Sequence, residues 1–316
     1  MIKRFFTGLI IFMALLVGLG IYYLYAPNLQ APLENVEKVT INLEGRDRSY
    51  WVYYPPNLKP GASLLFALHS SMSSGTEMRS WVGRTVERFA AQENTVVVYP
   101  DGYEGHFNDC RKVASYSARK LNIDDVGFMQ HIADKLVAEK GVRTEQVYAL
   151  GYSIGGHLAF RLAMEAPGML KGVVAIAANL PTADSMACKP AGLLPSFIGL
   201  VEGTEDPINP YAGGQVTLFG FGDRGNVLSA NASAKWFVDT MAMSVLATES
   251  EVNMSGSMVQ KKNWKSADAH ISLITIVGGG HTIPQGNFRF RRILGMTLED
   301  DSILESILNS MFAIND

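Results

Sequence analysis

The sequence predicts an α/β fold with a mostly parallel, twisted sheet that carries helices on both faces. Short apolar runs of strand length alternate along the chain with segments of helical spacing. The runs L-L-F-A-L at 64–68 and T-V-V-V-Y at 95–99 are apolar or nearly so throughout, which is typical of central strands buried on both sides. With 47% apolar and 18% charged residues, the chain has ample material for one large core.

The elements follow in order along the chain. Two early strands flank a turn at 44–47, and Pro-Asp-Gly at 100–102 ends a later strand. Asp124 or Asp125, and further on Ser229, are placed to cap the starts of helices. The predicted strands are 39–43, 49–54, 64–68, 95–99, 146–150, 173–177, 196–201 and 272–277, and the predicted helices are 76–92, 125–140, 154–165, 229–240 and 299–312. Residues 241–265, rich in Met, Ser and Lys, receive no assignment.

The N-terminus has a different composition. Lys3 and Arg4 precede an uncharged run at 5–24, and twenty helical residues span about 30 Å, the thickness of a bilayer core. We expect a signal-anchor or transmembrane helix at 1–25, a linker with two prolines at 26–37, and a catalytic domain at 38–316. The domain would then be exported, on the periplasmic side of the inner membrane in a Gram-negative source. Cleavage of the segment, the alternative, would make the protein secreted.

The net charge of the chain and the spacing of its histidines argue against two kinds of partner, nucleic acids and metal ions. The net charge is −3 and no basic run exceeds two residues, so we expect no nucleic-acid partner. The six histidines form no H-E-x-x-H or similar cluster, so we expect neither a metal nor a cofactor. Cys110 and Cys188 are the only cysteines. A disulfide is permitted in an exported domain, although the sequence leaves their separation in space open.

The segment V-Y-A-L-G-Y-S-I-G-G-H at 147–157 carries the first sign of chemistry. G-x-S-x-G alone is weak evidence in a chain with 30 glycines. Here, however, it lies between a predicted strand and a predicted helix, which is the context of a nucleophile elbow. Ser153 would stand at a helix N-terminus, where backbone N–H groups favour developing negative charge. The sequence therefore predicts that Ser153 is a nucleophile; a serine that only caps the helix is the alternative.

A nucleophilic serine needs a general base and an acid that orients it. His281 follows I-T-I-V-G-G-G, at the carboxyl end of the last strand, and is the predicted base. His157 lies on the elbow helix, and His270 precedes the last strand at its wrong end. Asp206, in V-E-G-T-E-D-P after the strand 196–201, is the predicted acid. The rival carboxylates are Glu202 and Glu205, with Asp223 and Asp239 as weaker ones.

An oxyanion hole needs two N–H donors. We assign one to the backbone amide of Ile154, next to the predicted nucleophile. The other should come from the loop L-H-S-S-M-S-S-G after the third strand, and we assign it to the amide of Ser70. His69 precedes the nucleophile in the chain, so we expect it to shape this loop rather than act as the base.

These segments resemble α/β-hydrolases of the polyhydroxybutyrate-depolymerase and feruloyl-esterase-like type. The resemblance covers most of 49–312 and is carried by L-H-S-S, Y-P-D-G, N-D-C-R, D-D-V-G-F, G-Y-S-I-G-G, E-G-T-E-D-P-I-N-P-Y and G-G-G-H-T-I-P. It implies a serine esterase whose nucleophile, acid and base correspond to Ser153, Asp206 and His281.

The chain departs from the family pattern at three positions. Ser70 stands where the family usually has Gly, Ile283 where it often has Trp, and Glu202 where it often has His. Cys110 lies in the family-like N-D-C-R loop. A bridge to Cys188 would pin two strand-end loops near the site.

The sequence thus predicts a serine carboxylic ester hydrolase that works through an acyl-enzyme on a small-molecule or polymer ester. A serine peptidase, acyltransferase or thioesterase of the same fold are alternatives, because one fold supports many acyl chemistries. An inactive, membrane-tethered binding domain is the alternative from a different class. The acyl group, the alcohol and the oligomeric state do not follow from the sequence.

Overall fold

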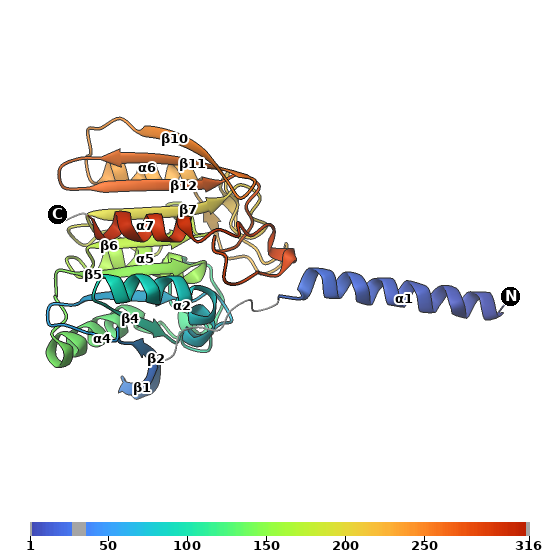
Figure 1. Cartoon of the computed structure of the whole chain (residues 1–316), viewed down its shortest axis with the longest axis horizontal. Helices are drawn as coiled ribbons and strands as arrows, with labels where there is room; N and C mark the ends of the chain where they lie inside the picture. Colours follow the sequence, from blue (N-terminus) through green and yellow to red (C-terminus); the bar gives the residue numbers. More distant parts are fainter. Residues whose placement is uncertain (1, 27–35, 314–316) are drawn as a thin grey trace.

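A ten-stranded sheet forms the centre of the catalytic domain (Figure 1). A computed structural model of the chain describes residues 2–26 and 36–313, with the side chains of the first helix from Leu9 onward. The strand order is β1-β2-β4-β3-β5-β6-β7-β12-β11-β10. These strands are β1 Val36–Leu43, β2 Arg46–Tyr53, β3 Ser63–Leu68, β4 Thr95–Pro100, β5 Val147–Tyr152, β6 Gly172–Ile176, β7 Phe197–Gly203, β10 Thr248–Met254, β11 Ser257–Lys265 and β12 His270–Ile276.

The middle of the sheet is parallel and its two edges are antiparallel. Strands β4, β3, β5, β6, β7 and β12 pair in parallel, so their carboxyl ends meet at one edge. Strands β3 to β7 of this group are buried at every position, as expected for strands covered on both faces. Ligands of such sheets bind beyond the carboxyl ends of the strands. The predicted α/β class with a mostly parallel centre is confirmed.

Helices cover both faces of the sheet. Side chains of β3 alternate between the two cores, with Phe66 on the side of α4, α5 and α6 and Leu65 on the side of α2 and α7. Because side chains alternate along a strand, one apolar run supplies both cores. The helices are α2 Gly75–Gln92, α3 Ser117–Lys120, α4 Asp125–Lys140, α5 Ile154–Glu165, α6 Ala230–Thr240 and α7 Ser302–Phe312, with the 3-10 helix η1 Arg292–Leu294.

One predicted boundary and one unassigned region differ in the structure. The linker was expected to reach residue 37, but β1 already begins at Val36. The unassigned residues 241–265 contain the hairpin of β10 and β11, whose exposed, polar edge strand shows little apolar alternation. A small separate ladder pairs β8 Gly214–Gln215 with β9 Asn226–Val227.

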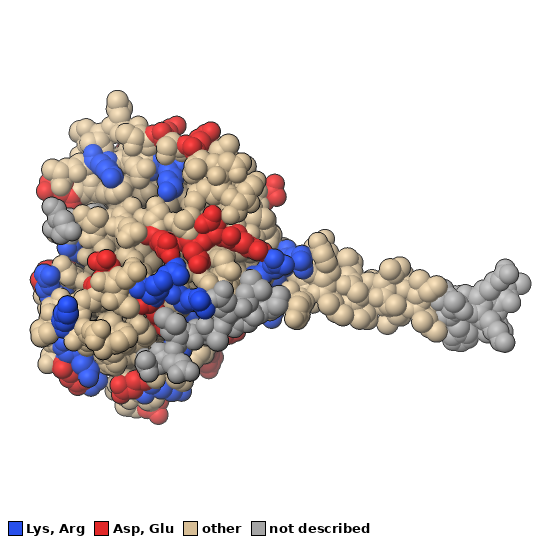
Figure 2. All heavy atoms as spheres, viewed as in Figure 1, with Lys and Arg blue, Asp and Glu red and all other residues tan. Residues whose placement is uncertain are grey.

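The N-terminal helix α1, Ile2–Leu24, projects away from the domain (Figure 1). From Leu9 onward α1 is free of charged side chains, whereas both signs are interspersed over the visible face of the domain (Figure 2). Arg292 in η1 contacts the end of α1: its guanidinium donates to the carbonyl oxygen of Tyr22 at 3.1 Å and lies 4.4 Å from the ring centre.

A transmembrane helix was predicted at 1–25. Across the part of the chain that the structure describes, no helix proves long and apolar enough to cross a membrane. Met1 and residues 27–35, which belong to the predicted anchor and linker, lie outside the described residues.

Candidate active site

Ser153 stands on a strained turn between β5 and α5. Its backbone φ of 56° and ψ of −115° are unusual for a residue with a side chain and cost about 1–3 kcal/mol. The flanking glycines permit the turn. A Cβ at Gly151 would lie 2.1 Å from the carbonyl oxygen of Gly155, and one at Gly155 would lie 2.2 Å from that of Leu68. The Ser153 side chain makes no cap to α5, which argues against a serine that serves only as a helix cap.

The structure brings Ser153, His281 and Asp206 into one hydrogen-bonded chain. His281 Nε2 lies 2.9 Å from Ser153 Oγ, and His281 Nδ1 lies 2.7 Å from Asp206 Oδ2. The residues come from the ends of β5, β7 and β12, at the carboxyl edge of the parallel strands. With Nδ1–H donating to the carboxylate, Nε2 is left as an acceptor for the serine proton.

Backbone contacts hold both partners in place. Asp206 Oδ1 accepts hydrogen bonds from the amides of Ile208 at 2.7 Å and Asn209 at 2.8 Å, which leaves Oδ2 directed at His281. The phenol of Tyr152 donates to the backbone oxygen of His281 at 2.6 Å, and burial raises the pKa of Tyr152 well above its usual value. His281 is therefore held in position through both its side chain and its backbone.

The rival residues lie elsewhere. Glu202 is buried against the amide of Ala178 at 3.0 Å, and this burial raises its pKa well above the usual value. His157 is buried in α5 with Nδ1 unpaired. His270 contacts Asn263 Oδ1 at 2.9 Å, at the start of β12.

The two amides assigned to the oxyanion hole lie on segments that approach each other closely. Gly155, which follows Ile154, packs against the backbone at Leu68 and His69, directly before Ser70. His69 fixes the backbone of this loop: Nδ1 donates to the Ser70 carbonyl at 2.6 Å, and Nε2 accepts from the Gly102 amide at 2.8 Å. Burial lowers the pKa of His69 to about 4, so the ring is neutral at physiological pH.

A pocket of about 510 Å³ opens above Ser153 and His281. Its aromatic wall comes from α2 and from 288–290. Trp81 packs edge-on against Tyr152, with ring centres 5.7 Å apart, and 5.6 Å from Phe290. The family-like aromatic position after G-H-T holds Ile283, which is fully buried outside the pocket lining. Sequence patterns do not reveal this wall, because Trp81 and residues 288–290 lie outside every recognised motif.

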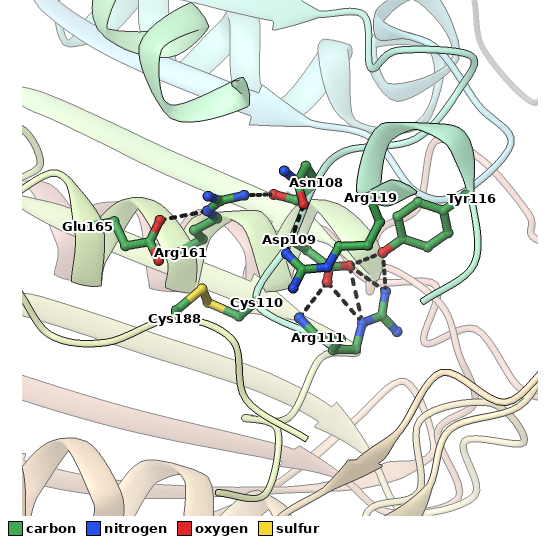
Figure 3. Close-up of a disulfide and its surroundings, with 9 residues drawn as sticks. All are labelled: Asn108, Asp109, Cys110, Arg111, Tyr116, Arg119, Arg161, Glu165 and Cys188. Carbon is green, nitrogen blue, oxygen red and sulfur yellow. Dashed lines mark hydrogen bonds and ion pairs between the residues drawn. A yellow bond between two sulfur atoms is a disulfide. The ribbon is translucent and has the colours of Figure 1, made fainter. Parts of the chain in front are cut away.

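A disulfide fixes the loop that begins near Asn108 (Figure 3). Cys110 and Cys188 are bonded in the structure, with Cα atoms 5.0 Å apart and a sequence separation of 78. Arg161 of the elbow helix α5 donates to the carbonyl oxygen of Asn108 at 2.7 Å. The loop is thereby connected both to the strand-end segment at Cys188 and to the helix that follows Ser153.

A strand–turn–helix serine, a histidine and an aspartate in this chain order, on a sheet of this topology, define the α/β-hydrolases. Over residues 2–26 and 36–313, no three His, Cys, Asp or Glu side chains are grouped to hold a metal ion. A family described as Phospholipase/Carboxylesterase matches residues 124–218, which include Ser153 and Asp206.

Similar proteins are esterases by name. The protein named "Putative esterase NocK" from Nocardia uniformis subsp. tsuyamanensis is 27% identical over 270 residues, which are 80% of this chain and 76% of that protein. Feruloyl esterase B of Piromyces equi is 24% identical over 71% of this chain and 40% of its own length. The acetyl xylan esterase structure from Aspergillus awamori superposes with a TM-score of 0.57 at 14% identity, over 80% of this chain and 96% of that one. The chain is an α/β-hydrolase similar to feruloyl esterases, and its enzyme class is that of the carboxylic ester hydrolases.

Proposed function

We propose that the chain hydrolyses carboxylic esters through a covalent acyl-enzyme on Ser153. The observation that carries the proposal is the continuous hydrogen-bonded chain from Ser153 Oγ through His281 to Asp206, located at the floor of a pocket. A binding domain would need neither the strained backbone at Ser153 nor a carboxylate directed at His281.

In the first half of the reaction, His281 Nε2 takes the proton of Ser153 Oγ as that oxygen attacks the ester carbonyl. The Oγ–C bond forms, and the carbonyl oxygen becomes an oxyanion that the amides of Ile154 and Ser70 stabilise. Asp206 stabilises the imidazolium. The tetrahedral intermediate then collapses, and His281 returns the proton to the departing alcohol.

In the second half, water replaces the alcohol. His281 Nε2 takes a proton from the water as its oxygen attacks the acyl carbon. The intermediate then collapses with cleavage of the bond from Ser153 Oγ to the acyl carbon, and His281 returns the proton to Oγ, which releases the carboxylic acid and restores Ser153. The aromatic wall of Trp81 and Phe290 favours an ester with an apolar or aromatic portion. Feruloyl and acetyl esters, named by the similar proteins, are therefore the first substrates to try.

We further propose that the domain is exported and held at a membrane by the N-terminal segment. The uncharged sequence run at 5–24 and the exposed apolar side chains of α1, such as Ile10 at 67% and Leu15 at 67%, support this. Leu24 and Ala26 also line the pocket, so the tether would hold the site close to the membrane surface.

Fractionation tests the tether. The full chain should stay in the membrane pellet after carbonate extraction, and a variant that begins at Val36 should be soluble. Recovery of a shortened chain outside the cell would instead support a cleaved signal segment.

Comparison of the wild type with Ser153→Ala on p-nitrophenyl acetate tests the esterase proposal. Loss of the nucleophile removes the covalent route, so turnover should fall by about 10⁴-fold or more. Ser73→Ala, a pocket-lining serine outside the hydrogen-bonded chain, is the matched control and should stay within about threefold of wild type. Turnover that survives in Ser153→Ala would contradict the proposal.

A further inference from the structure

Arg224 is a positively charged side chain in the wall of the pocket that contains Ser153 and His281. It lies between β8 and β9, and its backbone is held there: its amide donates to the carbonyl oxygen of Val216 at 3.0 Å, and the Val216 amide donates to that of Gly225 at 2.9 Å. The backbone of Arg224 is therefore hydrogen-bonded to the facing segment rather than part of a free loop.

The guanidinium of Arg224 has donors to spare. An arginine side chain carries five N–H groups, and within residues 2–26 and 36–313 this one makes a single hydrogen bond, from Nη1 to Ser71 Oγ at 3.3 Å. Among the described residues it forms no ion pair. Ser71 follows Ser70, so the guanidinium lies beside the segment assigned to the oxyanion hole.

The carboxylate of Asp109 already accepts hydrogen bonds from other side chains. The negative charge of Asp109 raises the pKa of Arg224, against the larger lowering effects of burial and of Arg111. The Oδ2 atom of Asp109 accepts hydrogen bonds from Arg111 Nη2 and Tyr116 Oη, each at 2.5 Å, and all three side chains are drawn together in Figure 3. Asp223, the sequence neighbour, is exposed and accepts the Gly225 amide at 2.8 Å. Both carboxylates therefore have hydrogen-bond partners of their own, and among the described residues neither forms an ion pair with Arg224.

The surroundings disfavour an unpaired charge at this point. Partial burial lowers the pKa of Arg224, and the neighbouring positive charge of Arg111 lowers it further. The pocket wall also includes Glu77 and Arg291, both of which are exposed to solvent. A partly buried guanidinium with unused donors binds a carboxylate strongly and often in a bidentate manner.

We propose that Arg224 is a specificity-determining residue that binds a carboxylate on the ester substrate, so that the preferred substrates are esters bearing a negative charge close to the scissile bond. This inference rests on the proposed esterase function and adds the chemical class of its substrate. It predicts selectivity within a single active site rather than a second site.

Two matched pairs of esters test the inference on the intact protein. In the first, 4-acetoxybenzoate carries the charge on the alcohol side and methyl 4-acetoxybenzoate is its neutral partner. In the second, p-nitrophenyl hydrogen adipate carries the charge on the acyl side and p-nitrophenyl methyl adipate is neutral. In at least one pair, Arg224→Gln should lower kcat/KM for the charged ester by about 10- to 100-fold, the range of a lost charge-assisted hydrogen bond. The neutral ester should change by less than about threefold and also reports that the variant is folded.

Two further variants show whether the effect is specific to the guanidinium of Arg224. Arg224→Lys should restore part of the loss because it keeps the charge without the bidentate geometry. Arg291→Gln removes an exposed arginine of the same pocket and should leave the charged-to-neutral ratio unchanged. An equal loss on both members of both pairs, no loss on either, or the same shift in Arg291→Gln would overturn the inference. No hydrolysis of any ester by the wild type would instead show failure of the proposed function.

Discussion

Replacement of Asp206 by Asn tests the orientation of the base. The side chain keeps its size, and the amide oxygen should occupy the position of Oδ1, because the Ile208 and Asn209 amides donate there at 2.7 and 2.8 Å. The opposite orientation would set the NH₂ group against these two donors. The NH₂ group therefore faces His281 Nδ1, 2.7 Å from the present Oδ2 position.

With the NH₂ group in that place, His281 must adopt the tautomer that carries its proton on Nε2. Nδ1 must accept from the new amide, so the ring proton moves to Nε2, which then faces Ser153 Oγ as a donor. The histidine can no longer accept the serine proton. A loss of about 10³- to 10⁴-fold in kcat follows, or roughly 4–5 kcal/mol of transition-state stabilisation, with little change in the unfolding temperature.

The assay is initial-rate hydrolysis of p-nitrophenyl acetate, with thermal unfolding measured on the same samples. Glu205→Gln is the matched control, because it removes an adjacent carboxylate whose exposed side chain lies outside the hydrogen-bonded chain. Its rate should stay within about threefold of wild type. A rate for Asp206→Asn within tenfold of wild type, or an equal loss in Glu205→Gln, would refute the reasoning.

Three further predictions concern the framework of the site. Gly155→Ala places a Cβ 2.2 Å from a backbone oxygen at the end of β3 and should abolish ester hydrolysis, whereas Gly286→Ala, with its nearest atom 3.9 Å away, should not; equal rates would contradict this. Reduction of the Cys110–Cys188 bond should add about 2 Da and lower the free energy of unfolding by about 4 kcal/mol in urea titrations, given the 78-residue separation; an unchanged mass would exclude the bond. Because the folded pKa of His69 is about 4, below the ordinary 6.5, protons bind the unfolded state first and stability should rise by up to about 3 kcal/mol between pH 4 and 6.5. His69→Gln should reduce that slope, and an unchanged slope would refute the assignment.

The sequence predicted most of the sheet because its central strands are long apolar runs between clear turns. Helices α4 and α5 begin and end where the spacing and caps placed them. The β10–β11 hairpin was missed because an edge strand gains little from burial: six of the seven residues of β10 are exposed. Its pairing depends on β12, which local patterns cannot reveal.

The candidate site also contains residues that the sequence could predict and residues that it could not. Ser153, Asp206 and His281 could be predicted because each lies within a few residues of the end of a recognisable strand, and parallel strands bring their carboxyl ends to one edge. Arg224 could not be found, because it lies in a segment without apolar periodicity and its significance comes from unused donors in a folded pocket. Where no strand or motif leads to a residue, only the three-dimensional structure identifies its surroundings.

The most direct test of the central claim is to map the residue that reacts with a fluorophosphonate. Intact mass followed by peptide mapping of the labelled wild type should give one adduct, on the peptide containing Ser153, at a rate that falls sharply in His281→Ala. The account requires both results, because the Ser153 oxygen reacts only when His281 takes its proton. An adduct on another serine, or ester hydrolysis that continues after Ser153 is fully labelled, would contradict it.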